Sequence, residues 1–338
     1  MTRKQVLVFR ELPDDQLARL RAEHTVTVAN PRLPEQRDAF LAALPTAHGL
    51  IGASYPIDAT VLDQAPCLEA VSSISVGVDN YDRPALAARD IVLTHTPGVL
   101  TETTADTLFA LVMACSRRIV ELANHVRDGH WRAPIGASHF GWDVHGKTLG
   151  ILGFGRIGQA VARRASLGFG MPVIYHHPRE VACPALESRV RAVSLSQLLS
   201  EADILVLCLP LTEATRGLIS AERLAAMKPG AILVNGSRGP VVDEAALIAA
   251  LDTGSLRAAG LDVFAVEPLP LDSPLRRHSA SPRCPTSARP PTKRATPWRR
   301  WRPPSCCRRW RANGRPGWWC EPLTTRRWGL GLLLHCNN

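Results

Sequence analysis

The stretch TLGILGFGRIGQAVARRA, residues 148–165, decides the fold. An apolar run of strand length leads into glycines spaced G-x-G-x-x-G, and an amphipathic helical pattern follows directly. The chemistry of such a loop needs a tight turn at Gly153, close approach of the backbone to a pyrophosphate at Gly155, and close packing of helix on strand at Gly158. The strand, the helix and the next apolar run, PVIYHH, all agree with this interpretation. We therefore predict a dinucleotide site that includes Gly153, Phe154, Gly155, Arg156, Ile157 and Gly158.

The end of the second strand indicates which dinucleotide is bound. A site that prefers NAD usually carries Asp or Glu about 20 residues beyond the motif, where the carboxylate binds the ribose hydroxyls. In this chain His177 stands 19 residues after Gly158, and Arg179 follows it. Arg179 could pair with a 2′-phosphate, and no carboxylate at the usual place repels one. We expect NADP(H) to be favoured, with NAD(H) as the alternative; a solvated loop is the simpler interpretation of His177 and Arg179.

Apolar runs of strand length alternate with helical patterns on both sides of this loop. The first series, which begins with QVLVF at residues 5–9, ends near Pro97, and the second begins at Lys147. A long helical pattern with an apolar stripe from Leu108 to Ile119 starts at Thr101 between them. Alternation of this kind is typical of parallel sheets covered on both faces. The predicted fold class is therefore α/β, with two doubly wound parallel-sheet domains over about residues 1–275.

Charge is distributed very unevenly along the chain. The 338 residues carry a net charge of +10, yet residues 276–338 hold 15 Lys and Arg against Glu321 alone. Six of the eight Trp and five of the nine Cys also fall in that segment, whereas the earlier Cys are scattered singly and show no metal-ligand spacing. The N-terminus lacks a secretory signal pattern, and no apolar run reaches the length of a membrane span. We expect a cytoplasmic protein with no metal site and no membrane partner.

Several ordered motifs together resemble one enzyme family. They are ISVGVDNYD, HTPGVLTETTADTLFALV, GKTLGILGFGRIGQAVARRA, MKPGAILVNGSRGPVVDEAALIAAL and AAGLDVFAVEPLPLDSPL. They are similar to the D-isomer-specific 2-hydroxyacid dehydrogenases, and within that family to the bacterial glyoxylate/hydroxypyruvate reductases, also called 2-ketogluconate reductases. The resemblance covers residues 1–275. It implies a flavodoxin-like substrate-binding domain over 1–100, a Rossmann NAD(P)-binding domain with an interdomain helix over 101–275, and a homodimer.

The resemblance also implies the roles of individual residues. Val76 and Gly77 would offer backbone N–H groups to the carboxylate of a small 2-oxo acid substrate. Arg238 would be the catalytic arginine that also binds substrate, and Asp262 would lie near the nicotinamide carboxamide. Glu267 would orient the catalytic histidine. These residue types suit the chemistry, since the reduction of a 2-oxo acid needs a cation on the carboxylate and carbonyl and a proton donor for the developing alkoxide. Without the motifs, Arg238 would be interpreted as a surface ion pair and Glu267 as a helix cap.

The proton donor is missing from its place. The family histidine is expected 19 residues after Glu267, where this chain has Thr286. One hypothetical set of codons for residues 284–299, regrouped one nucleotide earlier, reads Leu-Pro-His-Ile-Gly-Ser-Ala-Thr, which is the family motif. We therefore interpret the segment from about residue 276 as a shifted reading frame and expect activity to be impaired. A nucleotide-binding module without turnover is the alternative.

As a polymer, residues 276–338 have no regular apolar period and are rich in proline, so we expect them to be disordered. Arginines interleaved with Trp298, Trp301 and Trp310 resemble a nucleic-acid-binding segment. The shifted frame explains the same composition without such a role, and we expect no nucleic-acid partner. His278 is a weak candidate for a substitute proton donor, because no predicted strand or turn aims it at the site.

Overall fold

The computed structural model describes residues 3–179, 181–186, 188–278 and 281–282. These residues form two compact units, and the boundary between them falls between Val99 and Leu100. Apart from five residues near its start, the basic segment 276–338 lies outside the described residues, so its expected disorder stays a prediction.

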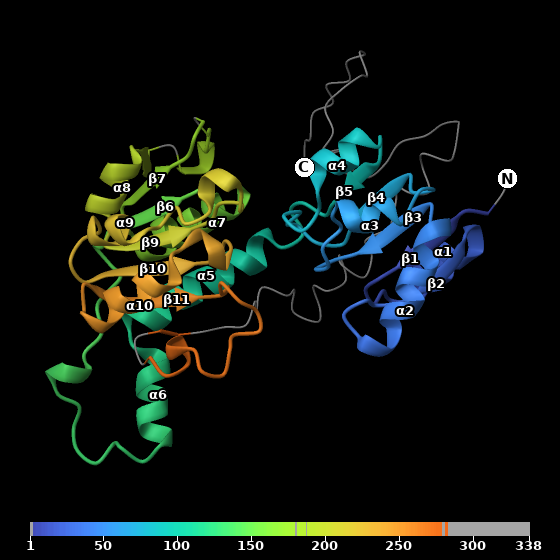
Figure 1. The fold of residues 1–338 in the computed structure, drawn as a ribbon. Helices are drawn as coiled ribbons and strands as arrows, with labels where there is room; N and C mark the ends of the chain where they lie inside the picture. Colours follow the sequence, from blue (N-terminus) through green and yellow to red (C-terminus); the bar gives the residue numbers. More distant parts are fainter. Residues whose placement is uncertain (1–2, 180, 187, 279–280, 283–338) are drawn as a thin grey trace. The chain divides into compact units, whose positions relative to one another are not determined.

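The first unit is built on a parallel sheet of five strands, shown in blue in Figure 1. The strands are β1 (Gln5–Val8), β2 (Thr25–Val28), β3 (Gly49–Gly52), β4 (Ala70–Ser73) and β5 (Val92–Thr94). Their order is β2-β1-β3-β4-β5, and every neighbouring pair is parallel. This is the strand order of the flavodoxin-like doubly wound fold.

Helices cover both faces of this first sheet. They are α1 (Asp14–Glu23), α2 (Pro34–Ala43), α3 (Ala59–Asp63) and α4 (Arg83–Ala88). Alternate residues of a strand point to opposite faces. Leu7 and Leu50 accordingly pack in the cluster that includes Phe40 of α2, whereas Val8 and Ile51 pack with Leu20 of α1. Both faces are apolar because both are buried, as the sequence pattern predicted.

The second unit carries a parallel sheet of six strands. These are β6 (Leu149–Leu152), β7 (Val173–His176), β8 (Val190–Ala192), β9 (Ile204–Leu207), β10 (Ala231–Asn235) and β11 (Leu256–Leu261). The order β8-β7-β6-β9-β10-β11, numbered from the first strand of the unit, is 3-2-1-4-5-6. That is the order of the Rossmann dinucleotide-binding fold, in which the connection reverses direction between β6 and β9. The two sheets together confirm the predicted fold class.

The second unit has six helices in its described part, and all of them except α6 pack on a face of its sheet. They are α5 (Thr101–Ser116), α6 (Ile119–Arg127), α7 (Arg156–Arg163), α8 (Leu195–Glu201), α9 (Ala221–Ala225) and α10 (Glu244–Asp252). Ile151 and Val206 pack against side chains of α5 and α7, whereas Leu205 and Leu233 pack against those of α8, α9 and α10. This alternation holds β6 and β9 rigidly at the centre of the sheet.

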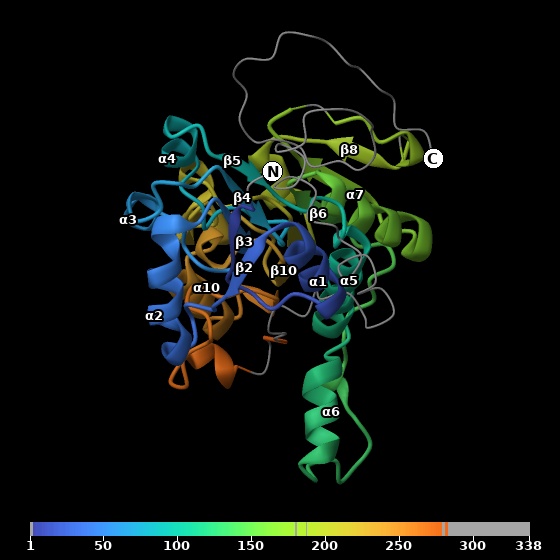
Figure 2. The ribbon, with the colours of Figure 1, turned by 90° about the vertical axis from the view of Figure 1, so that its right-hand side faces the viewer.

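The long helix expected from Thr101 is broken. It ends at Ser116, and Arg118 takes a left-handed backbone conformation with φ 54° before α6 begins. After α6 the chain returns to the end of α5, where the Trp142 N–H donates to the Ser116 carbonyl at 2.7 Å. We call residues 117–141 the arm. Its helix α6 buries none of its residues, and Figures 1 and 2 show it projecting from the sheet of its own unit.

The described part of the chain continues a short way beyond Leu275. Leu275 is fully buried, Ser281 is 2% exposed, and the Leu261 N–H at the end of β11 donates to the Pro282 carbonyl at 3.1 Å. The start of the basic segment therefore still packs on the second unit. No helix in the described part of the chain has both the length and the apolar character needed to cross a membrane.

Candidate active site

The predicted cofactor and catalytic residues of the second unit gather at one edge of its sheet. In parallel strands the carboxyl ends meet at the same edge, and ligands of such folds bind outside that edge where the strand order reverses. Gly153 follows β6, His177 follows β7, Arg238 comes shortly after β10 and Asp262 follows β11. The fold therefore brings residues from four separate motifs to the same edge.

The glycine loop has the geometry that its motif predicts. Gly153 has φ +96°, and a Cβ on it would lie 2.6 Å from the Cys208 carbonyl oxygen after β9. A Cβ on Gly158 would collide with the carbonyl oxygen of Gly153. Around Gly155, in contrast, a Cβ would meet nothing within 4 Å. Gly153 and Gly158 are thus required by packing within the protein, whereas the space next to Gly155 is open.

That open space lies at the start of α7. Gly155 is the N-cap residue and offers no side chain to the free N–H groups of the first turn, which includes Arg156 and Ile157. Such groups and the helix dipole favour an anion. The loop therefore fits the pyrophosphate of a dinucleotide, which would lie against Gly155 and the first turn of α7.

Phe154 contributes to this loop only through its backbone. Its ring is fully buried and stacks on Tyr175 of β7, with the ring centroids 3.8 Å apart. This contact ties the loop to the neighbouring strand, and so does the Gly153 N–H, which donates to the His176 carbonyl at 3.0 Å.

His177 and Arg179 form a short turn next to the glycine loop. The Arg179 N–H donates to His177 Nδ1 at 3.2 Å, and the Arg179 side chain belongs to an exposed residue. They follow β7, the strand whose end receives the adenosine ribose in Rossmann folds. Their position is therefore compatible with a contact to the ribose or to its 2′-phosphate.

Arg238 is held by the ends of β10 and β11. Asn235 Nδ2 donates to the Arg238 carbonyl at 3.1 Å, and Arg238 Nη1 donates to the Ser237 carbonyl at 2.8 Å. The next residue, Gly239, lies so close to the Phe264 carbonyl group that a Cβ would overlap it. This packing places the Arg238 loop directly beside the segment that follows Asp262, which is itself 3% exposed.

Glu267 closes the turn after β11. Its Oε1 accepts the Phe264 N–H at 3.0 Å, and the residue is exposed to solvent. Because Gly239 packs on Phe264, the loops that carry Arg238 and Glu267 are neighbours. The carboxylate is therefore positioned by its own turn rather than by a distant element.

Val76 and Gly77 belong to the first unit and lie beyond the carboxyl end of β4. The carbonyls of three successive residues there are all bound: Ser75 O by the Thr96 N–H at 3.1 Å, Val76 O by His95 Nδ1 at 2.9 Å and Gly77 O by Ser75 Oγ at 2.7 Å. Within the described residues, the N–H groups of Val76 and Gly77 donate to no acceptor.

Successive backbone N–H groups without an acceptor can form a small anion-binding nest. These are the two N–H groups that the family resemblance implies for the substrate carboxylate. The sequence reasoning did not identify His95 and Ser75, which hold the nest. The pairing of β4 with β5, which brings Thr94 opposite Ser72, would have pointed to His95.

His278 lies away from the carboxyl edge. Its Nε2 is 3.5 Å from Asp252 Oδ1 at the end of α10, just before β11 begins at Leu256. That is the amino edge of the sheet, so this pairing argues against His278 as a proton donor at the site.

The six-stranded sheet and its glycine loop define a dinucleotide-binding protein. The chain belongs to the D-isomer specific 2-hydroxyacid dehydrogenases, an oxidoreductase family: the model of their NAD binding domain matches residues 109–284. It is 52% identical over 272 residues to glyoxylate/hydroxypyruvate reductase B of Escherichia fergusonii, which covers 80% of this chain and 83% of that protein. The protein of the same name in Yersinia pestis is 52% identical over 270 residues, with the same coverage.

Solved structures agree with this assignment. The TT0316 protein of Thermus thermophilus superposes with a TM-score of 0.75 at 46% identity, covering 84% of this chain and 89% of that one. The NADPH-dependent glyoxylate/hydroxypyruvate reductase of Sinorhizobium meliloti, solved with NADP and malonate, gives a TM-score of 0.75 at 31% identity, with coverage of 88% and 91%.

Proposed function

We propose that the active form of this protein reduces glyoxylate, hydroxypyruvate or a related 2-oxo acid such as 2-ketogluconate to the D-2-hydroxy acid, with NADPH as the reductant. The observation that carries the proposal is the open dinucleotide loop at Gly155, at the same edge of the six-stranded sheet as Arg238 and Asp262. The curated relatives that match over most of the chain carry the names of the same reaction.

Each residue has a defined task in the proposed reaction. The nest at Val76 and Gly77 binds the substrate carboxylate, and Arg238 holds the 2-oxo acid and polarises its carbonyl. Asp262 lies near the carboxamide of the nicotinamide. When bound, the reduced nicotinamide supplies the hydride. Glu267 has a carboxylate oxygen engaged by the Phe264 N–H, which orients the other oxygen for an imidazole partner.

We infer that this 338-residue chain works slowly because that imidazole is absent. Thr286 occupies the expected place of the histidine, and loss of a general acid typically costs a factor of about 10² to 10⁴ in rate. A chain whose reading frame is restored from residue 276 should regain that factor. The test compares glyoxylate-dependent oxidation of NADPH by the two chains, each verified by intact mass.

Three outcomes of that test have distinct meanings. Fast turnover by the restored chain alone supports a damaged reductase. NADPH binding by both chains with turnover by neither supports a nucleotide-binding module. Equal, fast turnover by both would refute the assignment of the missing proton donor to position 286.

We propose that Arg179 favours NADPH over NADH. The support is its exposed place in the turn after β7, beside the glycine loop. Arg179→Gln should weaken NADPH binding by about tenfold, the worth of one charge-assisted hydrogen bond, and leave NADH binding unchanged. Arg189→Gln, at another exposed arginine of the second unit, is the matched control. Equal losses for both dinucleotides would contradict the proposal.

We also propose that the protein forms a homodimer through the arm. Half of the large apolar side chains that are exposed among the described residues belong to it: Ile119, Val120, Val126, Trp131, Ile135 and Phe140. A concentration of this kind marks a protein interface. Val126→Asp should shift sedimentation toward the monomer, whereas the exposed Leu271→Asp outside the arm should not. A wild-type chain that sediments as a monomer at micromolar concentration would refute it.

A further inference from the structure

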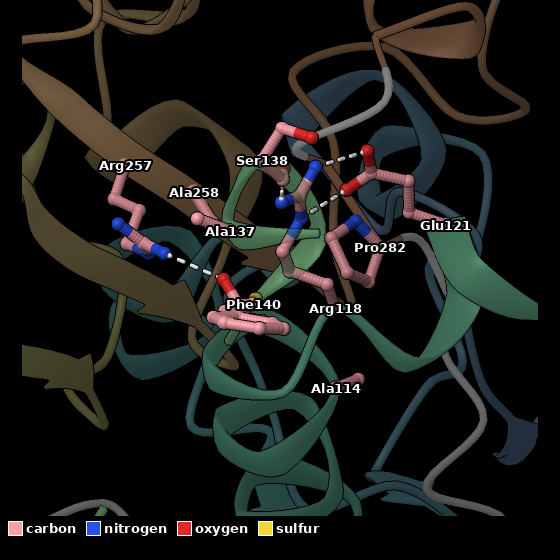
Figure 3. Close-up of a pocket in the computed structure, with 10 residues that line it drawn as sticks. Ala114, Arg118, Glu121, Ala137, Ser138, Phe140, Arg257, Ala258 and Pro282 are labelled. Carbon is pink, nitrogen blue, oxygen red and sulfur yellow. Dashed lines mark hydrogen bonds and ion pairs between the residues drawn. The ribbon is translucent and has the colours of Figure 1, made fainter. Parts of the chain in front are cut away.

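A cavity of about 360 Å³ lies at the root of the arm, within the second unit and away from the glycine loop. Its walls come from the end of α5, the start of α6, the returning segment of the arm, the first residues of β11 and Pro282. Figure 3 shows Arg118 and Glu121 on one side of it and Arg257 on the other. The residues that line it have no part in the proposed reaction.

The charge of one arginine in this cavity is already balanced. Arg118 donates through Nε to Glu121 Oε2 at 2.8 Å and through Nη2 to Glu121 Oε1 at 2.5 Å, and its Nη1 donates to the Ser138 carbonyl. These hydrogen bonds raise the pKa of Arg118 and lower that of Glu121. The pair is therefore neutral as a unit and fixes one wall of the cavity.

Arg257, in contrast, forms no ion pair with a carboxylate among the described residues. Its Nη2 donates to the Phe140 carbonyl at 3.3 Å, and its guanidinium carbon lies 4.6 Å from the centre of the Trp142 ring. Its buried Nε makes no hydrogen bond, and no carboxylate in the described part of the chain lies within ion-pair distance. Burial, and then the charge of Arg118, lower the pKa of Arg257, and the charge of Glu121 acts in the opposite direction. A half-buried cation with no carboxylate in ion-pair contact favours an anion at this wall.

Apart from Ser138, the remaining side chains that line the cavity are apolar. Cys115 is 3% exposed and forms part of the wall with Ala114 and Ala258, and the Phe140 ring is 60% exposed beside the cavity. Ligand sites usually combine such an apolar surface with few polar groups that fix orientation. An apolar wall and one uncompensated guanidinium suit a compact acid with a hydrophobic body.

We propose that this cavity binds a small organic acid, with its carboxylate on Arg257 and its apolar body between Phe140 and the side chains of α5. Such a ligand joins the returning segment of the arm to β11. It therefore fastens the root of the arm next to the left-handed residue Arg118.

The test uses benzoate as the probe and benzamide as its uncharged analogue, titrated calorimetrically into the full 338-residue chain. Benzoate should bind at least about tenfold more tightly than benzamide. Arg257→Gln should weaken benzoate by at least about tenfold, because it removes the charge, and Arg257→Lys should retain part of the affinity. Ala114→Leu, which fills the cavity without changing its charge, should abolish binding even if Arg257→Gln proves too unstable to assay.

Arg238→Gln distinguishes this site from the substrate site, since benzoate could also bind there. Benzoate affinity should be unchanged in that variant. The proposal is overturned if Arg238→Gln abolishes binding, if Arg257→Gln or Ala114→Leu leaves it intact, or if benzamide binds as well as benzoate. None of these measurements depends on turnover, so failure of the proposed reaction would leave the result unaffected.

Discussion

Gly153→Ala should lower the stability of the protein, whereas Gly155→Ala should weaken the binding of the dinucleotide. Gly153 has φ +96°, and its Cβ would lie 2.6 Å from the Cys208 carbonyl oxygen, well inside normal contact. Left-handed strain of about 1–3 kcal/mol and overpacking of about 1–3 kcal/mol together predict a loss of about 2–6 kcal/mol. That is a large fraction of the total stability of a domain.

Gly155→Ala should behave in the opposite way. A Cβ there meets nothing within 4 Å, so stability should change by no more than about 0.5 kcal/mol. The same methyl group occupies the space that a pyrophosphate needs. NADPH affinity should therefore fall by at least about tenfold.

Urea unfolding followed by circular dichroism measures the first effect, and fluorescence titration with NADPH measures the second. Both assays work without catalysis and therefore apply to this chain as it stands. If Gly153→Ala unfolds at the wild-type urea concentration, the close approach of the β6 loop to the end of β9 is wrong. If Gly155→Ala binds NADPH as wild type does, the open space is not the pyrophosphate site.

Three further outcomes are expected. His95→Phe removes the hydrogen bond on the Val76 carbonyl and should raise the KM for glyoxylate about tenfold, whereas NADPH affinity stays constant; steady-state kinetics on the frame-restored chain measure both. Glu267→Gln should shift the pH profile of the frame-restored chain, whose imidazole it orients, but not that of the present chain. Glu121 has a pKa held below its ordinary value of 4.5 by Arg118, so its contribution to stability is fully present above that pH and is lost as pH falls through the lower, folded value. The protection factors of the arm amides in hydrogen exchange should therefore fall at acid pH, and Glu121→Gln should remove that pH dependence.

Each of these predictions has a result that contradicts it. An NADPH affinity that falls while KM rises in His95→Phe would show a general loss of folding rather than a disturbed nest. A Glu267→Gln shift in the present chain would mean that another titrating group uses this carboxylate. Equal acid sensitivity of the arm in wild type and Glu121→Gln would show that the ion pair does not hold its root.

Much of the fold could be predicted because the glycine motif and the apolar runs of the strands indicate the same parallel-sheet architecture. The glycines after β6 and the apolar runs of β9 and β10 specify buried parallel strands, and the structure confirms this. The short strand β8, with exposed residues at Arg191 and Ala192, has no apolar run and gave no signal. The break at Arg118 could not be predicted either, because a left-handed backbone conformation is usually indicated by glycine and this residue is arginine.

The candidate site was predictable only in part. Motif residues identify Arg238 and Glu267, but the packing of Gly239 on Phe264 depends on β10 and β11 being neighbours. His95 reaches the Val76 carbonyl only because β4 and β5 pair. Such support is set by strand order, which a motif does not contain.

The hydrogen bond between the Trp142 N–H and the Ser116 carbonyl makes the arm separable from the rest of the second unit. The arm leaves the second unit and rejoins it at almost the same point, closed by one backbone hydrogen bond. A short turn could replace residues 117–141 without altering the register of any strand. The proposed self-association can therefore be gained, lost or retargeted by evolution or by engineering independently of the nucleotide-binding unit.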